Sequence, residues 1–358
     1  MTSPDDPHSD LHDAAIASPL VATPPHSFFG APQCHDLESF DHEVALLGVP
    51  YDQGSLIPYC RVGQSQGPNA VRTNPTFFYG GNPFDGPPDA TKPCVGFICV
   101  DDGQEYLRGV TMADIGDVVI PPGDIKAFIN TTTRVARRIA ERGSVLVSVG
   151  GDHSIAFPLV RGMEPWGTLE VVQFDAHFDT RDVVGGSRYS HSSPIHRISE
   201  LPFVEKITQF GIRNFASRES LAMADKIGSM VVPASEMHAK GAAQAVAEHT
   251  PARKNVYLTI DTDFFDWSIV PGTVLPEPGG FTVQEFRECV QTIAGRSNIV
   301  GFDVVCLNPL VDTAWYGGVT TRLVSYVMAY TLGYLFAART TTSAGSTAPA
   351  AVGASRQV

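Results

Sequence analysis

The sequence predicts an α/β fold built on a parallel sheet. Three observations support this prediction: short apolar runs rich in β-branched residues, segments of helical spacing that alternate with those runs, and a chain long enough for a large core. With 358 residues, of which 43% are hydrophobic and 18% are charged, the composition fits a globular enzyme rather than a disordered or fibrous protein.

Six short runs are candidate strands because they are apolar on both faces, as strands of a helix-covered parallel sheet are. They are Val44–Val49, Val145–Val149, Leu169–Phe174, Ile207–Gly211, Val256–Ile260 and Ile299–Val305. Alternating strands and helices predict right-handed crossovers, and in such sheets ligands bind beyond the carboxyl ends of the strands. The residues that directly follow each strand are therefore the candidates for a functional site.

Two predicted helices carry capping signals. Asp124 is a candidate N-cap of a helix that runs to about Arg142, and Thr282 with Glu285 forms a capping box ahead of a second helix. The apolar run from 323 to 338 contains polar residues and is short for a membrane span, which favours a buried terminal helix.

Composition also predicts the organisation of the chain. Residues 1–41, rich in Pro, Ser, His and Asp, are expected to form a flexible arm or an oligomer contact. Residues 42–339 are expected to form one catalytic domain, and the low-complexity segment 340–358 a disordered tail. The acidic N-terminus lacks the apolar core of a signal peptide.

Charge and cysteine usage narrow the possible partners. A net charge of −13 disfavours nucleic-acid partners and would attract a cationic small-molecule substrate, and no membrane partner is expected. None of the six cysteines forms a CxxC pair, which favours a reducing, cytoplasmic setting.

Metal-ligand residue types follow three of the predicted strands. The segments read GGDHS over 150–154, DAHFD over 175–179 and DTDFFD over 261–266. Residues i, i+2 and i+4 of an extended chain share a face, so four carboxylates and two imidazoles can converge: His153, Asp175, His177, Asp179, Asp261 and Asp263. A lone Asp after a strand usually caps a turn. However, this many acids need cations, and mixed ligands of this kind suit Mn²⁺, with Ni²⁺, Co²⁺, Fe²⁺ or Zn²⁺ as alternatives.

These three segments resemble the signature segments of the ureohydrolases, the arginase and agmatinase family. Other segments are similar too. The stretch 47–52, followed by Gly67-Pro68 and 70–72, resembles the first strand and Gly-Pro loop of the family, 114–117 its D-x-G-D turn and 276–280 its PEPGG element. The resemblance covers about residues 44 to 338.

The resemblance implies a three-layer α/β/α fold with a central parallel sheet, assembled as a trimer or hexamer. It also implies two divalent metal ions per subunit, with Mn²⁺ the family's usual metal and Ni²⁺ an alternative. One ion would be held by His153, Asp175, Asp179 and Asp261, and the other by Asp175, His177, Asp261 and Asp263. The implied activity is cleavage of a C–N bond in a guanidine or amidine by a hydroxide bridging the metals, which releases urea or a urea-like product and an amine.

Further roles follow from the same resemblance. The segment 189–194 is similar to the agmatinase segment whose histidine shuttles a proton, so His191 is the predicted proton shuttle. Asp179 is the second predicted catalytic residue. The alternative for His191 is an ordinary loop histidine. Asp152 and Asp266 are expected to orient the metal ligands.

The chain departs from the family in the predicted substrate pocket. Cys306 replaces a glutamate that pairs with the substrate guanidinium, Leu275 replaces a threonine and Trp267 a proline. With Arg188, these residues form the predicted substrate-binding set. Because a buried guanidinium without a carboxylate partner is costly, an atypical substrate such as a modified guanidine or biguanide is expected. Cys306 as a nucleophile is an alternative, although nothing in the sequence activates its thiol.

Two other readings remain open. The chain could be a non-catalytic, metal-binding subunit that regulates or scaffolds an active paralogue, since the glutamate is lost. It could also be a deacetylase of the related fold, but the DxHxD and DxD segments disfavour that mononuclear pattern.

Overall fold

The fold is organised around one sheet. The structure, a computed structural model, describes residues 7–8, 11, 19–55, 62–74, 78–79, 89–250, 252–313 and 317–344. Nine strands form the sheet in the order β1-β5-β2-β6-β11-β10-β7-β8-β9, and all neighbours are parallel except β1 and β5. The strands are β1 (Val21–Ala22), β2 (Val44–Val49), β5 (Met112–Val118), β6 (Val145–Gly150), β7 (Leu169–Phe174), β8 (Val204–Ile212), β9 (Met230–Pro233), β10 (Asn255–Asp261) and β11 (Asn298–Val305).

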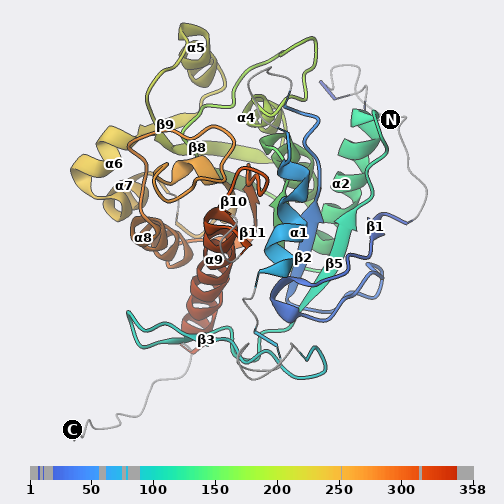
Figure 1. The fold of residues 1–358 in the computed structure, drawn as a ribbon. Helices are drawn as coiled ribbons and strands as arrows, with labels where there is room; N and C mark the ends of the chain where they lie inside the picture. Colours follow the sequence, from blue (N-terminus) through green and yellow to red (C-terminus); the bar gives the residue numbers. More distant parts are fainter. Residues whose placement is uncertain are drawn as a thin grey trace, which may run out of the picture.

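Helices cover both faces of this sheet and complete three layers (Figure 1). On one face lie α2 (Ile125–Glu141), α3 (Ala156–Gly162) and α4 (Pro194–Ser199). On the other lie α1 (Gly67–Thr73), α6 (Ala234–Lys240), α7 (Ala242–His249), α8 (Val283–Ala294) and α9 (Val319–Ala344). The helix α5 (Arg218–Lys226) projects at the top of the view in Figure 1. The parallel α/β fold and its three layers are confirmed.

The predicted elements form where their local signals place them. All six predicted strands are present, and each is apolar on both faces because helices cover the sheet on both sides. The Asp124 carboxylate accepts a hydrogen bond from Ala127 N at the start of α2, and the Thr282–Glu285 capping box opens α8. The apolar terminal run is the buried part of α9.

The predicted D-x-G-D turn is wrong. Residues 114–117 lie inside β5, where Asp114 is fully buried and accepts a hydrogen bond from Arg72 Nε at 2.8 Å. Arg72 also donates from Nη1 to Asp117 at 2.5 Å. Two acids can lie in a buried strand here because one guanidinium pairs with both.

Residues 19–41 were predicted to belong to a flexible arm, but several of them pack against the domain. Val21 pairs with Val118 across β1 and β5, and Phe28 and Phe29 are buried in the core. Of the range 1–41, the described part from residue 19 onward therefore contributes an edge strand and buried side chains to the domain. The domain boundaries at 42 and 339 stay predictions. The tail predicted from 340 begins within α9, and residues 345–358 lie outside the described residues.

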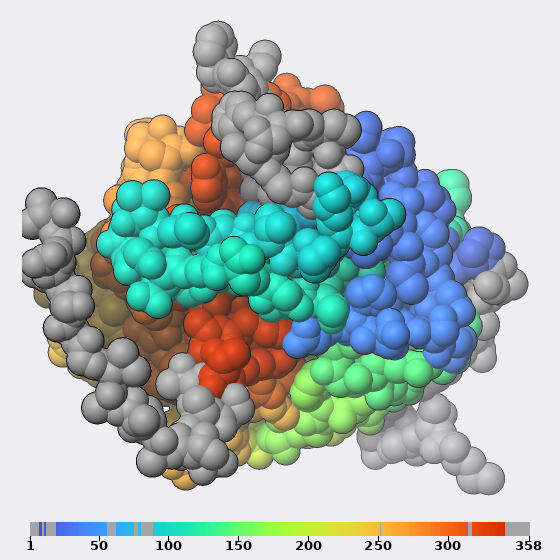
Figure 2. All heavy atoms as spheres, turned by 90° about the horizontal axis from the view of Figure 1, so that it is seen from below, coloured from blue at the N-terminus to red at the C-terminus, as the bar shows by residue number. Residues whose placement is uncertain are grey.

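A two-stranded hairpin closes the opposite end of the molecule from α5. Its strands are β3 (Phe97–Ile98) and β4 (Glu105–Tyr106), and Figure 2 shows this segment lying across helix α9. Edge-to-face contacts of Phe97 with Tyr330 and of Tyr106 with Tyr334 fix it there. Among the described helices, none combines the length and apolarity needed to cross a membrane.

Candidate metal centre

The predicted ligands lie at the carboxyl ends of neighbouring strands. His153 follows β6, whereas Asp175, His177 and Asp179 follow β7 and the pair Asp261 and Asp263 ends or follows β10. Since β11 separates β6 from β10, and β10 lies beside β7, these strand ends form one edge at the middle of the sheet. Ligands that are far apart in sequence are brought together there by parallel pairing.

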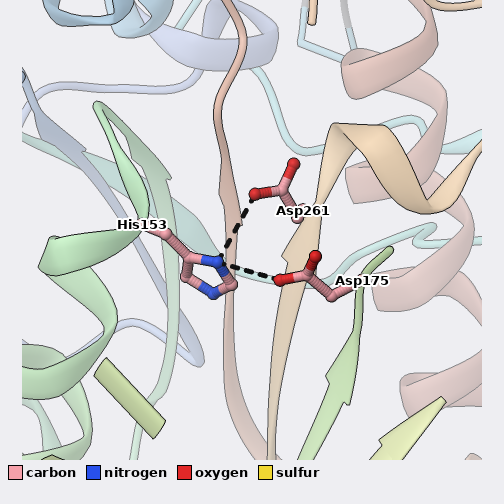
Figure 3. Close-up of side chains that lie close together, drawn as sticks. All are labelled: His153, Asp175 and Asp261. Atoms are coloured by element: carbon pink, nitrogen blue, oxygen red, sulfur yellow. Dashed lines mark ion pairs between the residues drawn. The ribbon is translucent and has the colours of Figure 1, made fainter. Parts of the chain in front are cut away.

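One group of ligands surrounds the imidazole of His153. Its Nδ1 atom lies 3.1 Å from Asp175 Oδ2, 2.9 Å from Asp179 Oδ2 and 3.4 Å from Asp261 Oδ2. Figure 3 shows the Asp175 and Asp261 carboxylates directed at this nitrogen. The nitrogen is buried and makes no hydrogen bond of good geometry within the described residues. Three acids and one imidazole nitrogen thus face a common point.

A second group shares Asp175 with the first. His177 Nδ1 lies 2.9 Å from Asp263 Oδ2 and 3.6 Å from Asp175 Oδ1. Both three-residue groups, His153–Asp175–Asp261 and Asp175–His177–Asp263, have ligand atoms close enough to hold one ion each. Asp179 lies beside the first group and adopts a left-handed backbone with φ 50°, a conformation that a non-glycine residue rarely takes without a local reason.

The clustered carboxylates favour positive charge at their centre, on the histidine rings or on bound cations. Burial acts to lower the pKa of His153, but its interactions with Asp175, Asp179 and Asp261 raise that pKa well above its ordinary value. Burial and the neighbouring Asp261 and Asp175 charges raise the pKa of Asp263 well above its ordinary value. The carboxylates therefore repel one another strongly, and divalent cations between them would relieve that repulsion.

The ring of His153 is oriented by two residues that sequence reasoning missed. Its Nε2 donates to Thr259 Oγ1 at 2.9 Å, and the Thr259 hydroxyl donates to Asp303 Oδ1 at 2.7 Å. Tyr257 donates to the other Asp303 oxygen at 2.9 Å. Burial raises the pKa of Asp303 to about 6. The Thr259 hydroxyl has only one proton and donates it to Asp303, so it accepts from Nε2 of His153. This series of hydrogen bonds keeps a proton on Nε2 and leaves the Nδ1 lone pair facing the acids.

A third missed residue lies beside the other histidine. Glu277 Oε1 lies 3.7 Å from His177 Nε2, and Asn214 donates to its second oxygen. The interaction with His177 lowers the pKa of Glu277. Arg213 donates to the carbonyls of Asp263 at 2.6 Å and Glu277 at 2.9 Å, which ties the two loops together. Glu277 belongs to the segment 276–280 that resembles the PEPGG element, but the sequence analysis predicts no role for it.

Five of the six predicted ligands, all except Asp175, line a cavity of about 370 Å³. His191 lines it too, is 7% exposed, and its Nδ1 lies 2.9 Å from the carbonyl oxygen of Gly54. Asp152 also lines the cavity, and its carboxylate accepts hydrogen bonds from Ser154 N at 3.0 Å and Ser55 Oγ at 3.3 Å. It shapes the turn that carries His153 rather than contacting the His153 ring directly.

Two residues of the predicted substrate set lie in this cavity. Leu275 and Cys306 both line it. Burial, together with the charges of Asp261 and Asp263, raises the pKa of the Cys306 thiol well above its ordinary value. A neutral thiol is a poor nucleophile, so the geometry argues against Cys306 as an attacking group.

Three other predicted site residues lie elsewhere. Trp267 is 53% exposed and Arg188 pairs with Glu200 at 2.9 Å, and neither is among the cavity-lining residues. Asp266 accepts hydrogen bonds from Ser268 N at 3.1 Å and Gly279 N at 3.0 Å, so it orients the 276–280 loop, which carries Glu277. Its predicted effect on the metal ligands stays a prediction. The spacing of residues along the chain could not predict where these side chains lie.

The chain is similar to several known proteins. A sequence model described as "Arginase family" matches residues 42–333. Proclavaminate amidinohydrolase from Streptomyces clavuligerus is 31% identical over 302 residues, covering 82% of this chain and 88% of that protein. Guanidinopropionase from Pseudomonas aeruginosa is 30% identical over 332 residues, covering 89% and 96%. The solved structure of the Streptomyces enzyme superimposes with a TM-score of 0.69 at 26% identity, covering 90% of this chain and all of that one.

Proposed function

Because the chain belongs to the arginase family, we propose that it is an amidinohydrolase. It would cleave a C–N bond of a guanidino compound at the two groups of candidate metal ligands that share Asp175. One observation carries the proposal. Two groups of candidate metal-ligand side chains share the buried Asp175, and their other members line one cavity, as a two-ion site requires. The relatives that match over most of their length are named proclavaminate amidinohydrolase and guanidinopropionase.

The donor set fits two divalent cations. We propose His153, Asp175, Asp179 and Asp261 for one ion, and Asp175, His177, Asp261 and Asp263 for the other. The buried Nδ1 of His153, without a hydrogen bond among described residues, supports the fit. Carboxylate oxygens with single imidazoles suit Mn²⁺, with Ni²⁺ as the alternative. When bound, the two ions would lower the pKa of a water between them and polarise the substrate's C–N group.

The protein's own residues orient this centre. Thr259 and Asp303 hold the tautomer of His153, and Glu277 faces the outer nitrogen of His177. The hydrogen bond between His191 and the Gly54 carbonyl fixes the His191 ring at the cavity wall. We assign to His191 the transfer of a proton to the leaving amine, because a neutral amine leaves far more readily than an amide ion.

The substrate pocket supports an atypical guanidine. Cys306 and Leu275 give the cavity wall a neutral thiol and an isobutyl group. A guanidinium buried against them would lack a carboxylate partner at position 306, which is costly. The added substituents of a modified guanidine or biguanide could contact Leu275 and offset part of that cost.

The chemistry of the cysteines supports a cytoplasmic setting for the enzyme. The described cysteines, Cys34, Cys94, Cys99, Cys289 and Cys306, are all free, which is consistent with a reducing, cytoplasmic environment. A trimer or hexamer, with or without a paralogous subunit, is the assembly that the resemblance implies. Analytical ultracentrifugation of the purified chain, alone and with candidate paralogues, measures the number of subunits in the assembly.

Metal analysis combined with a substrate screen tests the proposed function. Protein reconstituted with excess Mn²⁺ or Ni²⁺ should hold about two ions per chain and release urea or ammonia from at least one member of a panel of guanidines, biguanides, formimino compounds and amides. The control is Asp225→Ala, an exposed carboxylate on α5. One ion or fewer would contradict the two-ion site. Two ions without turnover of any compound would instead favour a non-catalytic metal-binding subunit.

A further inference from the structure

Two buried glutamines connect the candidate metal ligands to the interior of the sheet. Gln173 on β7 and Gln209 on β8 are register partners in the parallel pairing of these strands, so their side chains lie on the same face. Both are fully buried, and neither is among the residues that line the cavity. A buried primary amide is costly unless its hydrogen-bonding groups find partners, so the partners of these two amides indicate what they do there.

The first amide holds the aspartate that both ligand groups share. Gln173 Nε2 donates to Asp175 Oδ2 at 2.5 Å, and the same nitrogen donates to the carbonyl oxygen of His177 at 3.4 Å. The other carboxylate oxygen, Asp175 Oδ1, accepts from His177 N at 2.6 Å. Each oxygen of Asp175 thus has a protein donor, which fixes the plane of the carboxylate and leaves its other lone pairs for metal ions.

The second amide continues this series of hydrogen bonds. Gln209 Nε2 donates to Gln173 Oε1 at 2.5 Å and to the carbonyl oxygen of Phe178 at 2.7 Å. Ser229, directly before β9, donates its hydroxyl to Gln209 Oε1 at 2.7 Å. The inner end determines the direction of the series, because a carboxylate that binds metal carries no proton. Each amide must therefore present its N–H groups toward the ligands and its oxygen away from them.

The contact with Phe178 also accounts for a backbone feature of the next ligand. Asp179 follows Phe178 and adopts φ 50°, a conformation that needs a local reason in a non-glycine residue. Because Gln209 holds the Phe178 carbonyl oxygen, it fixes the peptide plane that precedes Asp179. In this conformation the Asp179 carboxylate lies 2.9 Å from His153 Nδ1. A buried amide on β8 thereby helps to place a ligand on another segment.

We propose that Gln173 and Gln209 are positioning residues for the metal ligands: Gln173 orients the shared Asp175, and Gln209 supports Gln173 and places Asp179. The assignment rests on the proposed function, since it takes these aspartates to hold two ions. Outer partners of this kind orient ligating carboxylates, and their loss lowers metal affinity by about 10–100-fold. A change at Gln173 should therefore affect both ions, whereas a change at Gln209 should act most on the ion held with Asp179.

Methionine variants test the assignment, because methionine has an unbranched side chain without an amide. Gln173→Met and Gln209→Met are titrated with Mn²⁺ alone against a chelator, which gives the affinity of each ion without any substrate. The matched control is Thr208→Val, a buried polar-to-apolar change on β8 at a side chain on the opposite face from Gln209. Urea unfolding of the metal-free proteins measures any general loss of stability separately.

The expected result is a graded loss of Mn²⁺ affinity. Gln173→Met should weaken both ions by about 10–100-fold, Gln209→Met should weaken one ion more than the other, and Thr208→Val should bind as wild type. Unchanged affinities in the methionine variants, or losses no larger than in Thr208→Val, would overturn the assignment; if one methionine variant does not fold, the other decides. A wild type that binds two ions but hydrolyses nothing would leave the assignment standing while the proposed activity fails. A wild type that binds no Mn²⁺ would overturn both.

Discussion

Thr259→Val should loosen the metal ion held by His153 while sparing the other. Valine keeps the shape of threonine, so the change removes the hydroxyl that accepts from His153 Nε2 at 2.9 Å and donates to Asp303 at 2.7 Å. Without that acceptor, the tautomer with a proton on Nδ1 can pair with Asp179, 2.9 Å away, and this tautomer cannot bind metal. Loss of such an outer partner lowers metal affinity by about 10–100-fold, or ~1.4–2.8 kcal/mol.

Competition with a chelator measures this effect for each ion. The two ions should dissociate together or nearly so from wild type, and in two well-separated steps from Thr259→Val. His177 and Glu277 are untouched and serve as an internal reference. Thr331→Val is the control for folding, because the Thr331 hydroxyl is buried in α9 without a hydrogen bond within the described residues. Equal weakening of both ions, or no weakening at all, would refute the role given to Thr259.

Four further outcomes are expected. Asp175→Ala should lose both ions and all activity, measured by elemental analysis and urea release, because this residue belongs to both ligand groups; full activity would place the site elsewhere. His191→Asn should lower kcat by about 10²–10⁴ with metal content unchanged, and an unchanged rate would return it to a loop role. The double variant Cys306→Glu with Leu275→Thr should shift kcat/KM toward agmatine and arginine; if wild type already hydrolyses these at its best rate, the pocket argument is wrong. Arg72→Met leaves two buried or partly buried acids unpaired, so urea unfolding should show about 3–5 kcal/mol lost, and a loss below 1 kcal/mol would contradict the pairing.

The convergence of the proposed ligands could be predicted because it depends on local sequence and on one general rule. An apolar β-branched run followed by His153, by Asp175 or by Asp261 indicates a strand and the residue that leaves it. Parallel pairing then places all such residues at one edge, whatever the strand order. This is why convergence of the six ligands follows from the sequence before their distances are known.

The orienting residues could not be predicted in the same way. Thr259 and Asp303 are 44 residues apart and meet because they are register partners on β10 and β11. Register is set by the packing of the whole sheet, and a slip of one residue would turn each side chain to the opposite face. Asp266 and Trp267 show the converse case: they lie within or beside a signature segment, yet neither is among the residues that line the cavity.

The sequence by itself determined the α/β class, the caps of α2 and α8 and the types of ligand at each strand end, since these depend on side-chain chemistry and on neighbours within a few residues. Only the tertiary structure decided which carboxylate faces which imidazole, that the 114–117 segment is a strand, and that Arg181 rather than Arg188 lines the cavity. The reason is physical: these outcomes depend on contacts between segments far apart in the chain, and strand order and loop packing set those contacts.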